Sequence, residues 1–152
     1  MDEAAAKDRD PYRLERFVAA QDRGGTYERA VAELRAGAKV SHWMWFVFPQ
    51  VAGLGRSAMA SEFAILSVAE ARAYLAHAVL GPRLVECVQA ANAVQGRSAG
   101  DIFGYPDELK FRSCLTLFLL AAAADAKAPF QLALDKYFAG QADAITLQKL
   151  ER

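Results

Sequence analysis

The segment from Ser41 to Gln50, SHWMWFVFPQ, constrains the fold more than any other part of the sequence. It holds both tryptophans of the chain, one of its two histidines and two of its nine phenylalanines. Burial of one such large side chain stabilises a fold by about 2–3 kcal/mol. We therefore expect the segment to be buried, and we expect a binding site to involve the polar groups at its ends.

The local conformation of this aromatic segment does not follow from residue propensities alone. Aromatic and β-branched residues from Val40 to Phe48 are compatible with a strand. However, no other stretch has the pattern of a partner strand, and an isolated strand is not stable. We therefore expect a short helical or irregular segment that Ser41 caps and that ends before Pro49, because a residue before proline disfavours the helical conformation.

The rest of the chain has the punctuation and spacing of helices. Apolar residues recur at three- and four-residue intervals between Ser, Thr, Asp, Pro and Gly residues that mark helix ends. The first predicted helix covers Tyr12–Gln21, and Thr26 caps a second one that ends at Gly37. Because only Asp22–Gly25 separates them, we expect the two to pack as antiparallel neighbours. After the aromatic segment, Ser57 is expected to open a helix that buries Met59, Phe63 and Leu66.

The longest predicted helix begins at Pro106 and runs to about Ala124. Asp107 and Glu108 in its first turn suit the positive end of the helix dipole. From Cys114 onward the helix is apolar on nearly all sides, which is typical of a helix buried in the centre of a domain. The sequence therefore predicts an all-α fold, a compact single-domain bundle of about seven helices with a central buried helix at about 106–124. The domain is expected to span residues 10–152, after a disordered tail at 1–9.

The amino-acid composition limits the classes of partner that we expect for this protein. The chain has 152 residues, 54% hydrophobic and 24% charged, which suits one folded domain. The 18 Lys and Arg residues balance 18 Asp and Glu residues, so we expect no nucleic-acid partner and no anionic membrane surface. No apolar run approaches the roughly 20 residues of a membrane span, and the first residues lack the core of a signal peptide. We expect a cytoplasmic protein whose oligomeric state the sequence does not define.

Residues that bind metals or form a familiar catalytic motif are not clustered. Cys87 and Cys114 stand alone in apolar stretches, which indicates reduced core residues. The sequence contains no HExxH or CxxC pattern and no nucleophile elbow with partner His and Asp residues. We therefore expect no metal and no other cofactor.

One candidate site is the turn Gly53–Ser57, GLGRS. Glycines before a helix N-terminus expose backbone N–H groups that can hold a phosphate, and Arg56 adds a positive charge. The turn matches neither a GxGxxG motif nor a P-loop. An ordinary glycine turn with Ser57 as helix cap is the alternative, which we favour on this pattern alone.

A second candidate site is a polar stripe on the central helix. Asp107, Lys110 and Ser113 lie three residues apart, and Thr116 continues the stripe. A Lys and a Ser on one face can bind an anion or activate a hydroxyl group. The alternative is an Asp107–Lys110 ion pair at the exposed end and a Ser113 hydroxyl bonded to the preceding turn.

The aromatic segment itself is the third candidate. Trp43 and Trp45 could stack on a base or a sugar, although core packing is the more common use of such side chains. His42 could act as an acid–base group, because the ordinary pKa of histidine lies near 6.5. A lone histidine beside an apolar run is more often structural, so both interpretations of His42 stay open.

Several motifs carry a family resemblance: SHWMWFVFPQ at 41–50, GLGRS at 53–57, EARAYLAH at 70–77, LGPRL at 80–84, IFG at 102–104 and DELKFRSCLTLF at 107–118. From about Asp10 onward the chain resembles a family of small bacterial proteins of unknown function, the domain of unknown function eighteen-ten. Some members carry the label calpastatin, which does not fit a compact helical chain. The resemblance implies a mainly α-helical domain and brings no established activity.

The family motifs also single out individual positions. They place His42, Trp43, Trp45, Phe46, Pro49, Gln50, Gly53, Gly55, Ser57, Lys110, Ser113 and Thr116 in this chain. The chain departs from the common pattern at Phe63, where a tyrosine is usual, and at Ala78, where a proline often follows the histidine. The change at Phe63 removes a hydroxyl group, so a function of that group does not carry over.

These observations lead to two functional hypotheses. In the first, the protein binds or hydrolyses a small phosphorylated or nucleotide-like ligand, of the ADP-ribose or N-glycoside type. That ligand class rests on a general likeness to other small helical proteins. The catalytic candidates are His42, Lys110 and Ser113, and the ligand-binding candidates are Trp43, Trp45, Gln50, Gly53, Gly55, Arg56, Ser57 and Thr116. In the second hypothesis, the chain is a non-catalytic protein-interaction or structural domain.

Overall fold

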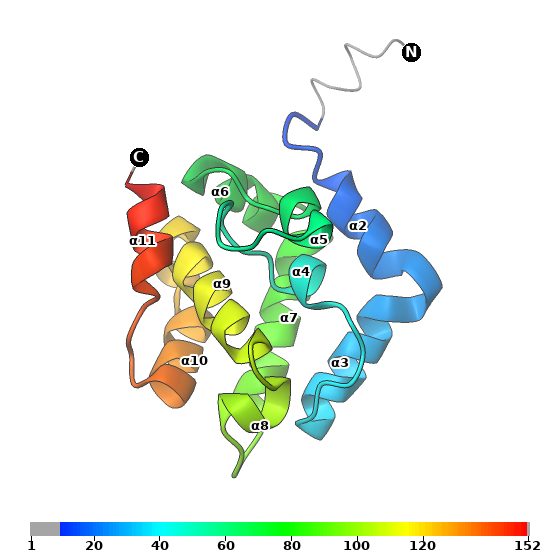
Figure 1. Ribbon diagram of the computed structural model, residues 1–152, viewed down its shortest axis with the longest axis vertical. Helices are drawn as coiled ribbons and strands as arrows, with labels where there is room; N and C mark the ends of the chain where they lie inside the picture. The colour runs from blue at the N-terminus through cyan, green and yellow to red at the C-terminus, as the bar shows by residue number, and fades with distance from the viewer. Residues whose placement is uncertain (1–9, 152) are drawn as a thin grey trace.

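The computed structural model describes residues 10–151, which fold into helices joined by short loops (Figure 1). In chain order the helices are α2 (Glu15–Asp22), the 3-10 helix η1 (Arg23–Gly25), α3 (Thr26–Ala36), α4 (Met44–Val47), α5 (Ala58–Glu62), α6 (Val68–Ala76), α7 (Leu80–Ala93), α8 (Ala99–Phe103), α9 (Asp107–Ala121), the 3-10 helix η2 (Ala124–Ala126), α10 (Ala128–Phe138) and α11 (Ala144–Leu150). No strand occurs within residues 10–151, which confirms the all-α class. The predicted tail, residues 1–9, lies outside the described residues.

The helix count exceeds the expected seven. The excess comes from α4, α5 and α8, which have only four or five residues each. Helices this short contain little more than one turn, so the periodicity of apolar residues is a poor guide to them, although Ser57 marks the start of α5 as predicted. They occur where the chain changes direction between longer helices (Figure 1).

The predicted central helix corresponds to α9. Phe111, Ser113 to Phe118, and Ala121 are buried along it, and α6, α8, α10 and α11 pack against it. Its end comes earlier than predicted, because Ala122 has extended backbone at φ −70°, ψ 145°. Behind it in Figure 1, α7 packs against α3, α6 and α10. The described residues therefore surround one core.

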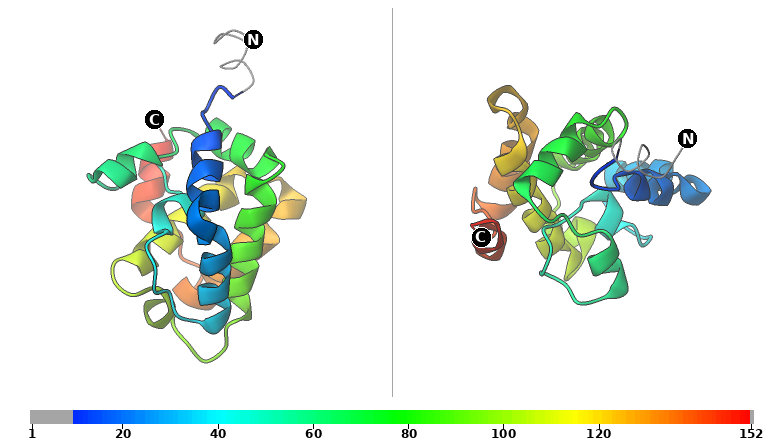
Figure 2. Two further views of the ribbon diagram at one scale, coloured as in Figure 1. Left: turned by 90° about the vertical axis from the view of Figure 1, so that its right-hand side faces the viewer. Right: turned by 90° about the horizontal axis from the view of Figure 1, so that it is seen from above.

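The first two long helices do not form the expected antiparallel pair. In Figure 2, α2 and α3 follow one another along the same side of the molecule. The single turn η1 bends the chain without reversing it, with Gly24 at φ 59° and Gly25 at φ 70°. Thr26 is the first residue of α3 and its hydroxyl donates to the Arg23 carbonyl, so it does not cap the helix. The predicted helix end at Gly37 is confirmed by its left-handed conformation, φ 74°.

The aromatic segment is a loop around the one-turn helix α4, as expected, but Ser41 does not cap it. Trp43 precedes α4, and Ser41 binds a side chain of α3. The Glu33 carboxylate accepts hydrogen bonds from the Val40 and Ser41 backbone N–H groups at 2.7 and 2.9 Å, from Ser41 Oγ at 2.5 Å and from Trp43 Nε1 at 3.0 Å. This carboxylate thus fixes the start of the segment while Trp43 itself is fully buried.

The segment after Phe48 pairs with a distant residue through one isolated bridge. Ala52 donates to the Ile65 carbonyl at 2.8 Å, and Ile65 donates to the Gln50 carbonyl at 2.9 Å. Because α5 ends at Glu62, helical spacing no longer applies beyond it. Phe63 is buried as predicted, whereas Met59 is exposed and Leu66 is 76% exposed, so those two predictions are wrong.

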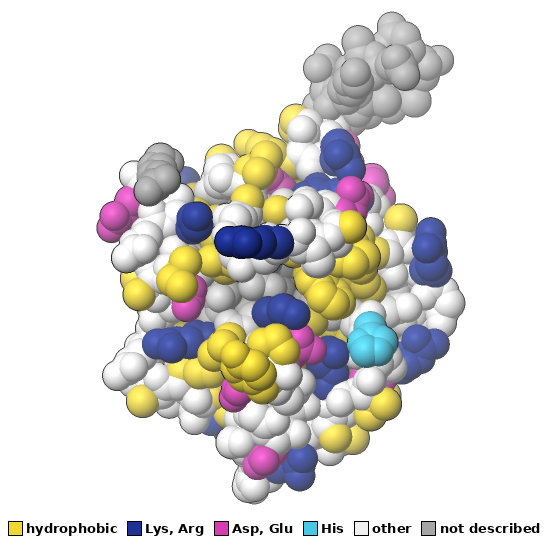
Figure 3. All heavy atoms as spheres, viewed as in Figure 1, with side chains coloured by type: hydrophobic (Ala, Val, Ile, Leu, Met, Phe, Trp, Pro, Cys, Tyr) yellow, Lys and Arg dark blue, Asp and Glu magenta, His cyan; other side chains and the backbone are white. Residues whose placement is uncertain are grey.

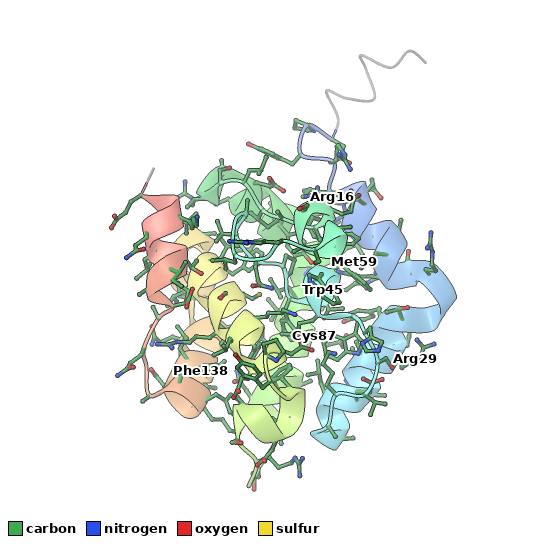
Figure 4. All side chains as sticks on the ribbon, in the orientation of Figure 1. Arg16, Arg29, Trp45, Met59, Cys87 and Phe138 are labelled. Atoms are coloured by element: carbon green, nitrogen blue, oxygen red, sulfur yellow. The ribbon has the colours of Figure 1, made fainter. Side chains whose placement is uncertain are left out.

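A buried ion pair joins α2 to this bridge region. Arg16 and Glu70 lie 3.2 Å apart, with side chains 13% and 3% exposed. Arg16, labelled in Figure 4, also donates to the carbonyls of Glu62 and Ala64 at 2.8 and 3.0 Å. The Glu70 carboxylate binds the Arg16 side chain and accepts a hydrogen bond from the Leu66 N–H. The side-chain cap of α6 is therefore the Ser67 hydroxyl, which accepts from the Glu70 N–H. Arg16 therefore holds the loop at residues 62–64 against α2.

Three further features of residues 10–151 bear on function. None of their helices is both long and apolar enough to cross a membrane. No three of their His, Cys, Asp or Glu side chains are grouped as metal ligands would be. Cys87 and Cys114 are buried and carry free thiols, as predicted.

The hydrogen bonds to Glu33 predict how stability depends on acid. Burial by itself raises the pKa of Glu33, but the bonds from Ser41, Val40 and Trp43 outweigh it and lower the pKa from 4.5 to about 2. A carboxyl with a depressed folded-state pKa stabilises the fold above its unfolded pKa, and this contribution is lost as pH falls from 4.5 towards 2. Glu33→Gln should lower the free energy of unfolding by about 2 kcal/mol at pH 6, since bonds to a charged group are lost.

Urea unfolding at pH 6 and at pH 3 measures this effect. The difference between the native protein and Glu33→Gln should shrink at pH 3, where the native carboxylate is losing its advantage. Glu28→Gln is the matched control, because Glu28 is an exposed residue of the same helix. An equal destabilisation by both variants, or a difference that does not change with pH, would contradict the prediction.

Candidate functional site

A cavity of about 530 Å³ opens between the aromatic segment, α9 and α11. Its volume falls in the range of about 300–1,000 Å³ that is usual for small-molecule sites. Figure 3 shows Lys and Arg side chains around the hollow in the middle of this face, between hydrophobic ones. The lining residues are Trp45, Gln50, Val51, Gly53, Leu54, Gly55, Arg56, Ser57, Ala60, Phe63, Pro106, Leu109, Lys110, Ser113, Asp143 and Ile145.

The cavity brings together most of the residues that the sequence singled out. The end of the aromatic segment, the glycine turn and the polar stripe of α9 all contribute to its wall. The candidate residues found there are Trp45, Gln50, Gly53, Gly55, Arg56, Ser57, Lys110 and Ser113. Figure 4 shows Trp45 near the middle of this face. The convergence concerns position alone, so the catalytic and binding functions of these residues stay predictions.

Three candidates lie elsewhere. His42 is exposed and does not line the cavity, so the structure separates it from Lys110 and Ser113. Trp43 is fully buried with its Nε1 bonded to Glu33, which leaves no ring face for stacking on a ligand. Thr116 is 1% exposed, and its hydroxyl donates to the Arg112 carbonyl and accepts from the Asp143 N–H. Trp43 and Thr116 serve the fold and His42 lies apart from the cavity, so we leave all three out of the proposal below.

The glycine turn is shaped by close contacts. Gly53 has φ +91°, and a Cβ there would lie 3.2 Å from the Nζ atom of Lys149 on α11. A Cβ at Gly55 would lie 2.8 Å from the Ala60 Cβ, which is closer than real Cβ contacts. The Ser57 hydroxyl accepts a bond from the Ala60 N–H at 3.1 Å, so its predicted capping function is confirmed. Arg56 is exposed and makes no hydrogen bond or ion pair with another described residue.

Lys110 forms the ion pair with Asp107 that the alternative interpretation predicted, but the sequence did not reveal that Lys39 shares it. Its Nζ lies 3.1 Å from Asp107 Oδ1, while Lys39 Nζ lies 2.9 Å from Asp107 Oδ2. Burial raises the pKa of Asp107, but hydrogen bonds from Lys39 and Lys110 outweigh it and lower that pKa below its ordinary value. One carboxylate between two ammonium groups leaves one net positive charge. No local pattern pointed to Lys39, because it comes from a loop far from α9 in the chain.

The Lys110 ammonium also lies over an aromatic ring. Its Nζ is 4.5 Å from the centroid of Trp45, within the range of a cation–π contact. Trp45 is half-buried and Lys110 is about a quarter exposed, at 24%. A positive charge on an indole ring at a cavity wall can attract a ligand that joins an anionic group to a flat or apolar group.

Asp143 lines the cavity but is not among the candidate residues from the sequence. Its Oδ2 accepts from the Thr146 N–H at 2.9 Å and the Thr146 hydroxyl at 2.6 Å, and it lies 3.4 Å from Ser113 Oγ. Ser113 Oγ also donates to the Leu109 carbonyl at 3.1 Å, which is the bond to the preceding turn that the alternative interpretation of the stripe predicted. Asp143 Oδ1 has no hydrogen bond to any of residues 10–151. The Asp-x-x-Thr spacing signals a cap, but no local signal shows that this cap faces a cavity.

The contact at Gly55 predicts a stability effect that maps the turn. Gly55→Ala forces its new methyl group against Ala60, and relief of such crowding usually costs about 1–3 kcal/mol. The matched control is Gly100→Ala in α8, where the new methyl meets the movable end of the Glu108 side chain at 3.1 Å. Thermal unfolding should show a lower midpoint for Gly55→Ala and little change for Gly100→Ala. A Gly55→Ala protein as stable as the native one would contradict this geometry.

Comparison with known proteins places the chain in a family. The profile described as "Protein of unknown function (DUF1810)" matches residues 11–150. The chain is similar to a solved structure, "Crystal structure of the conserved hypothetical protein Rv1873 from Mycobacterium tuberculosis at 1.38 A", with 51% sequence identity and a TM-score of 0.89. That match covers 94% of this chain and 99% of the other. No curated protein matches the chain. The chain therefore belongs to the DUF1810 family of proteins of unknown function.

Proposed function

We propose that the cavity binds a small phosphorylated or nucleotide-like ligand. The observation that carries this proposal is the pairing of positive charge with an aromatic surface, because Lys110 Nζ lies over Trp45 inside a cavity that Arg56 also lines. An anionic group is attracted to the two cations, and a flat ring can pack on the apolar walls. Ligand sites typically combine apolar walls with a few placed polar groups in this way.

The polar groups of the cavity support the proposal because several lack a partner. Neither the Gln50 amide nor the Arg56 guanidinium is hydrogen-bonded within the described part of the chain. Gln50 offers both a donor and an acceptor, and Arg56 offers a fork of donors that matches a phosphate. A polar group that is already bonded within the protein would gain little from a ligand. The Gln50 amide and the Arg56 guanidinium have only water to lose when a ligand binds.

The apolar side chains of the cavity indicate that the ligand has an apolar or flat part besides its phosphate. Leu54, Phe63 and Leu109 line the cavity together with Trp45 and Pro106. A simple inorganic anion would leave these surfaces in contact with water. A nucleotide-like molecule, including the ADP-ribose or N-glycoside type, covers them with its base or sugar and places its phosphate near the cations.

Hydrolysis of an N-glycosidic bond is the finer part of the proposal. Such a reaction needs a group that positions or activates water, and Asp143 is the carboxylate in the cavity wall. Lys110 would stabilise negative charge that develops on the ligand. Ser113 has its hydroxyl between the Leu109 carbonyl and Asp143 Oδ2, which suits orientation more than nucleophilic attack.

Binding is tested with a panel of nucleoside monophosphates, NAD, ADP-ribose and sugar phosphates, by thermal shift and tryptophan fluorescence. A ligand at 100 times its dissociation constant should stabilise the protein by about 2.7 kcal/mol. Emission should change as well, because Trp45 lines the cavity. Each of Lys110→Met and Arg56→Met should weaken binding of that ligand at least tenfold without changing the unfolding midpoint of the free protein by more than a few degrees.

Arg72→Met is the matched control, because Arg72 is also an exposed arginine but lies on α6 outside this cavity. It should leave affinity unchanged. Release of free base from N-glycosides, followed by chromatography, tests the hydrolytic part separately. No stabilisation by any member of the panel would contradict the proposal and favour the interaction-domain hypothesis.

A further inference from the structure

The cavity wall contributed by α11 holds an unpaired carboxylate. Asp143 Oδ2 is committed to the first turn of the helix, whereas Oδ1 has no hydrogen bond to a described residue. No Lys, Arg or His side chain of residues 10–151 lies within ion-pair distance of Asp143. An open carboxylate oxygen in a cavity accepts hydrogen bonds from O–H or N–H groups and repels an anion.

The same helix carries a cation beside the glycine turn, which lines another part of the cavity. Lys149 Nζ lies 3.2 Å from the point where a Gly53 Cβ would be, so its ammonium group rests on the glycine turn that also holds Arg56. Lys149 is exposed and forms no ion pair with the described residues. The six residues from Asp143 to Lys149 correspond to about 9 Å along the helix axis. An acceptor in the cavity wall therefore stands at the start of α11, and positive charge lies about two turns further on, beside the glycine turn.

We infer that the ligand is a phosphate monoester that also carries hydroxyl groups, such as a nucleoside monophosphate or a sugar phosphate. The inference rests on the proposed function and adds an orientation to it. The phosphate lies at the glycine turn between Arg56 and Lys149, and a sugar hydroxyl donates to Asp143 Oδ1. The opposite orientation would place the phosphate against a carboxylate that has no counter-ion.

This arrangement also predicts selectivity among anions. A ligand without hydroxyl groups leaves Asp143 without a donor, and sites built to bind a hydroxyl discriminate strongly against analogues that lack it. Inorganic phosphate satisfies the cations alone and should bind weakly. Asp143 is thus a specificity-determining residue, and Lys149 is a phosphate-binding residue that the family motifs do not include.

Two substitutions at Asp143 separate ligand binding from helix capping. In Asp143→Asn, the amide oxygen can still cap α11 because Asn is as good a cap as Asp, and the open oxygen is replaced by an NH₂ donor. In Asp143→Ser, the hydroxyl retains a cap and nothing takes the place of the open oxygen. Lys149→Met removes the second cation, whereas Lys149→Arg keeps the charge.

Isothermal titration of each variant with adenosine 5′-monophosphate, its 2′,3′-dideoxy analogue, ribose 5-phosphate and inorganic phosphate tests the inference. The native protein should prefer adenosine monophosphate over the dideoxy analogue at least tenfold. Asp143→Asn and Asp143→Ser should reduce that preference to less than threefold while inorganic phosphate binds as before or better. Lys149→Met should weaken all four ligands at least fivefold, and Lys149→Arg should restore them.

The outcomes distinguish this inference from the function on which it rests. If both Asp143 variants keep the tenfold preference, or if Lys149→Met binds every ligand normally, the inference is overturned while binding itself stands. If the native protein binds none of the four ligands, the inference fails, and the wider panel then decides whether the proposed function fails with it.

Discussion

The carboxylate of Glu33 fixes the aromatic segment, and the placement of the cavity wall depends on it. It accepts hydrogen bonds from two backbone N–H groups, a hydroxyl group and the indole N–H of Trp43, and all of these donors lie within residues 40–43. A buried indole N–H without a partner would be costly, so this single acceptor makes full burial of Trp43 possible. With Trp43 directed into the core, Trp45 two residues later lies at the cavity instead. Trp43 therefore packs in the core, and Trp45 lines the cavity.

The charges on α9 follow from the same competition between burial and hydrogen bonding. A lysine on a helix this apolar needs a partner, and Asp107 provides one for Lys110 at 3.1 Å. Lys39, whose side chain is 7% exposed, occupies the second oxygen of that carboxylate. Asp107 therefore cannot neutralise both, and the excess positive charge stays beside the cavity. An ordinary i, i+3 ion pair, as the sequence indicated, would have left the site nearly neutral.

Local signals in the sequence predicted what depends on a few neighbouring residues. The Gly37 helix end and the Ser57 cap are both present, because each involves one turn of backbone. Contacts between distant segments were not predictable in this way. Helical spacing placed Leu66 in the core, but the Val51–Ile65 bridge extends the chain there and exposes it. The sequence likewise identified Lys110 and the glycine turn as candidates without showing that Asp143 and Lys149 lie beside them.

At the start of α11, Asp143 combines a structural function with the proposed ligand contact. Thr116 and Ser113 on α9 were candidates for a site, and both contact Asp143, through its N–H and its Oδ2. These contacts and the bonds to Thr146 hold the Asp143 side chain in one orientation before any ligand arrives. Because an already ordered side chain loses little conformational entropy on binding, its open oxygen is a better acceptor than a mobile surface carboxylate would be. The polar stripe of α9 thus contributes to the cavity in two ways, directly through Lys110 and indirectly by orienting a residue on the neighbouring helix.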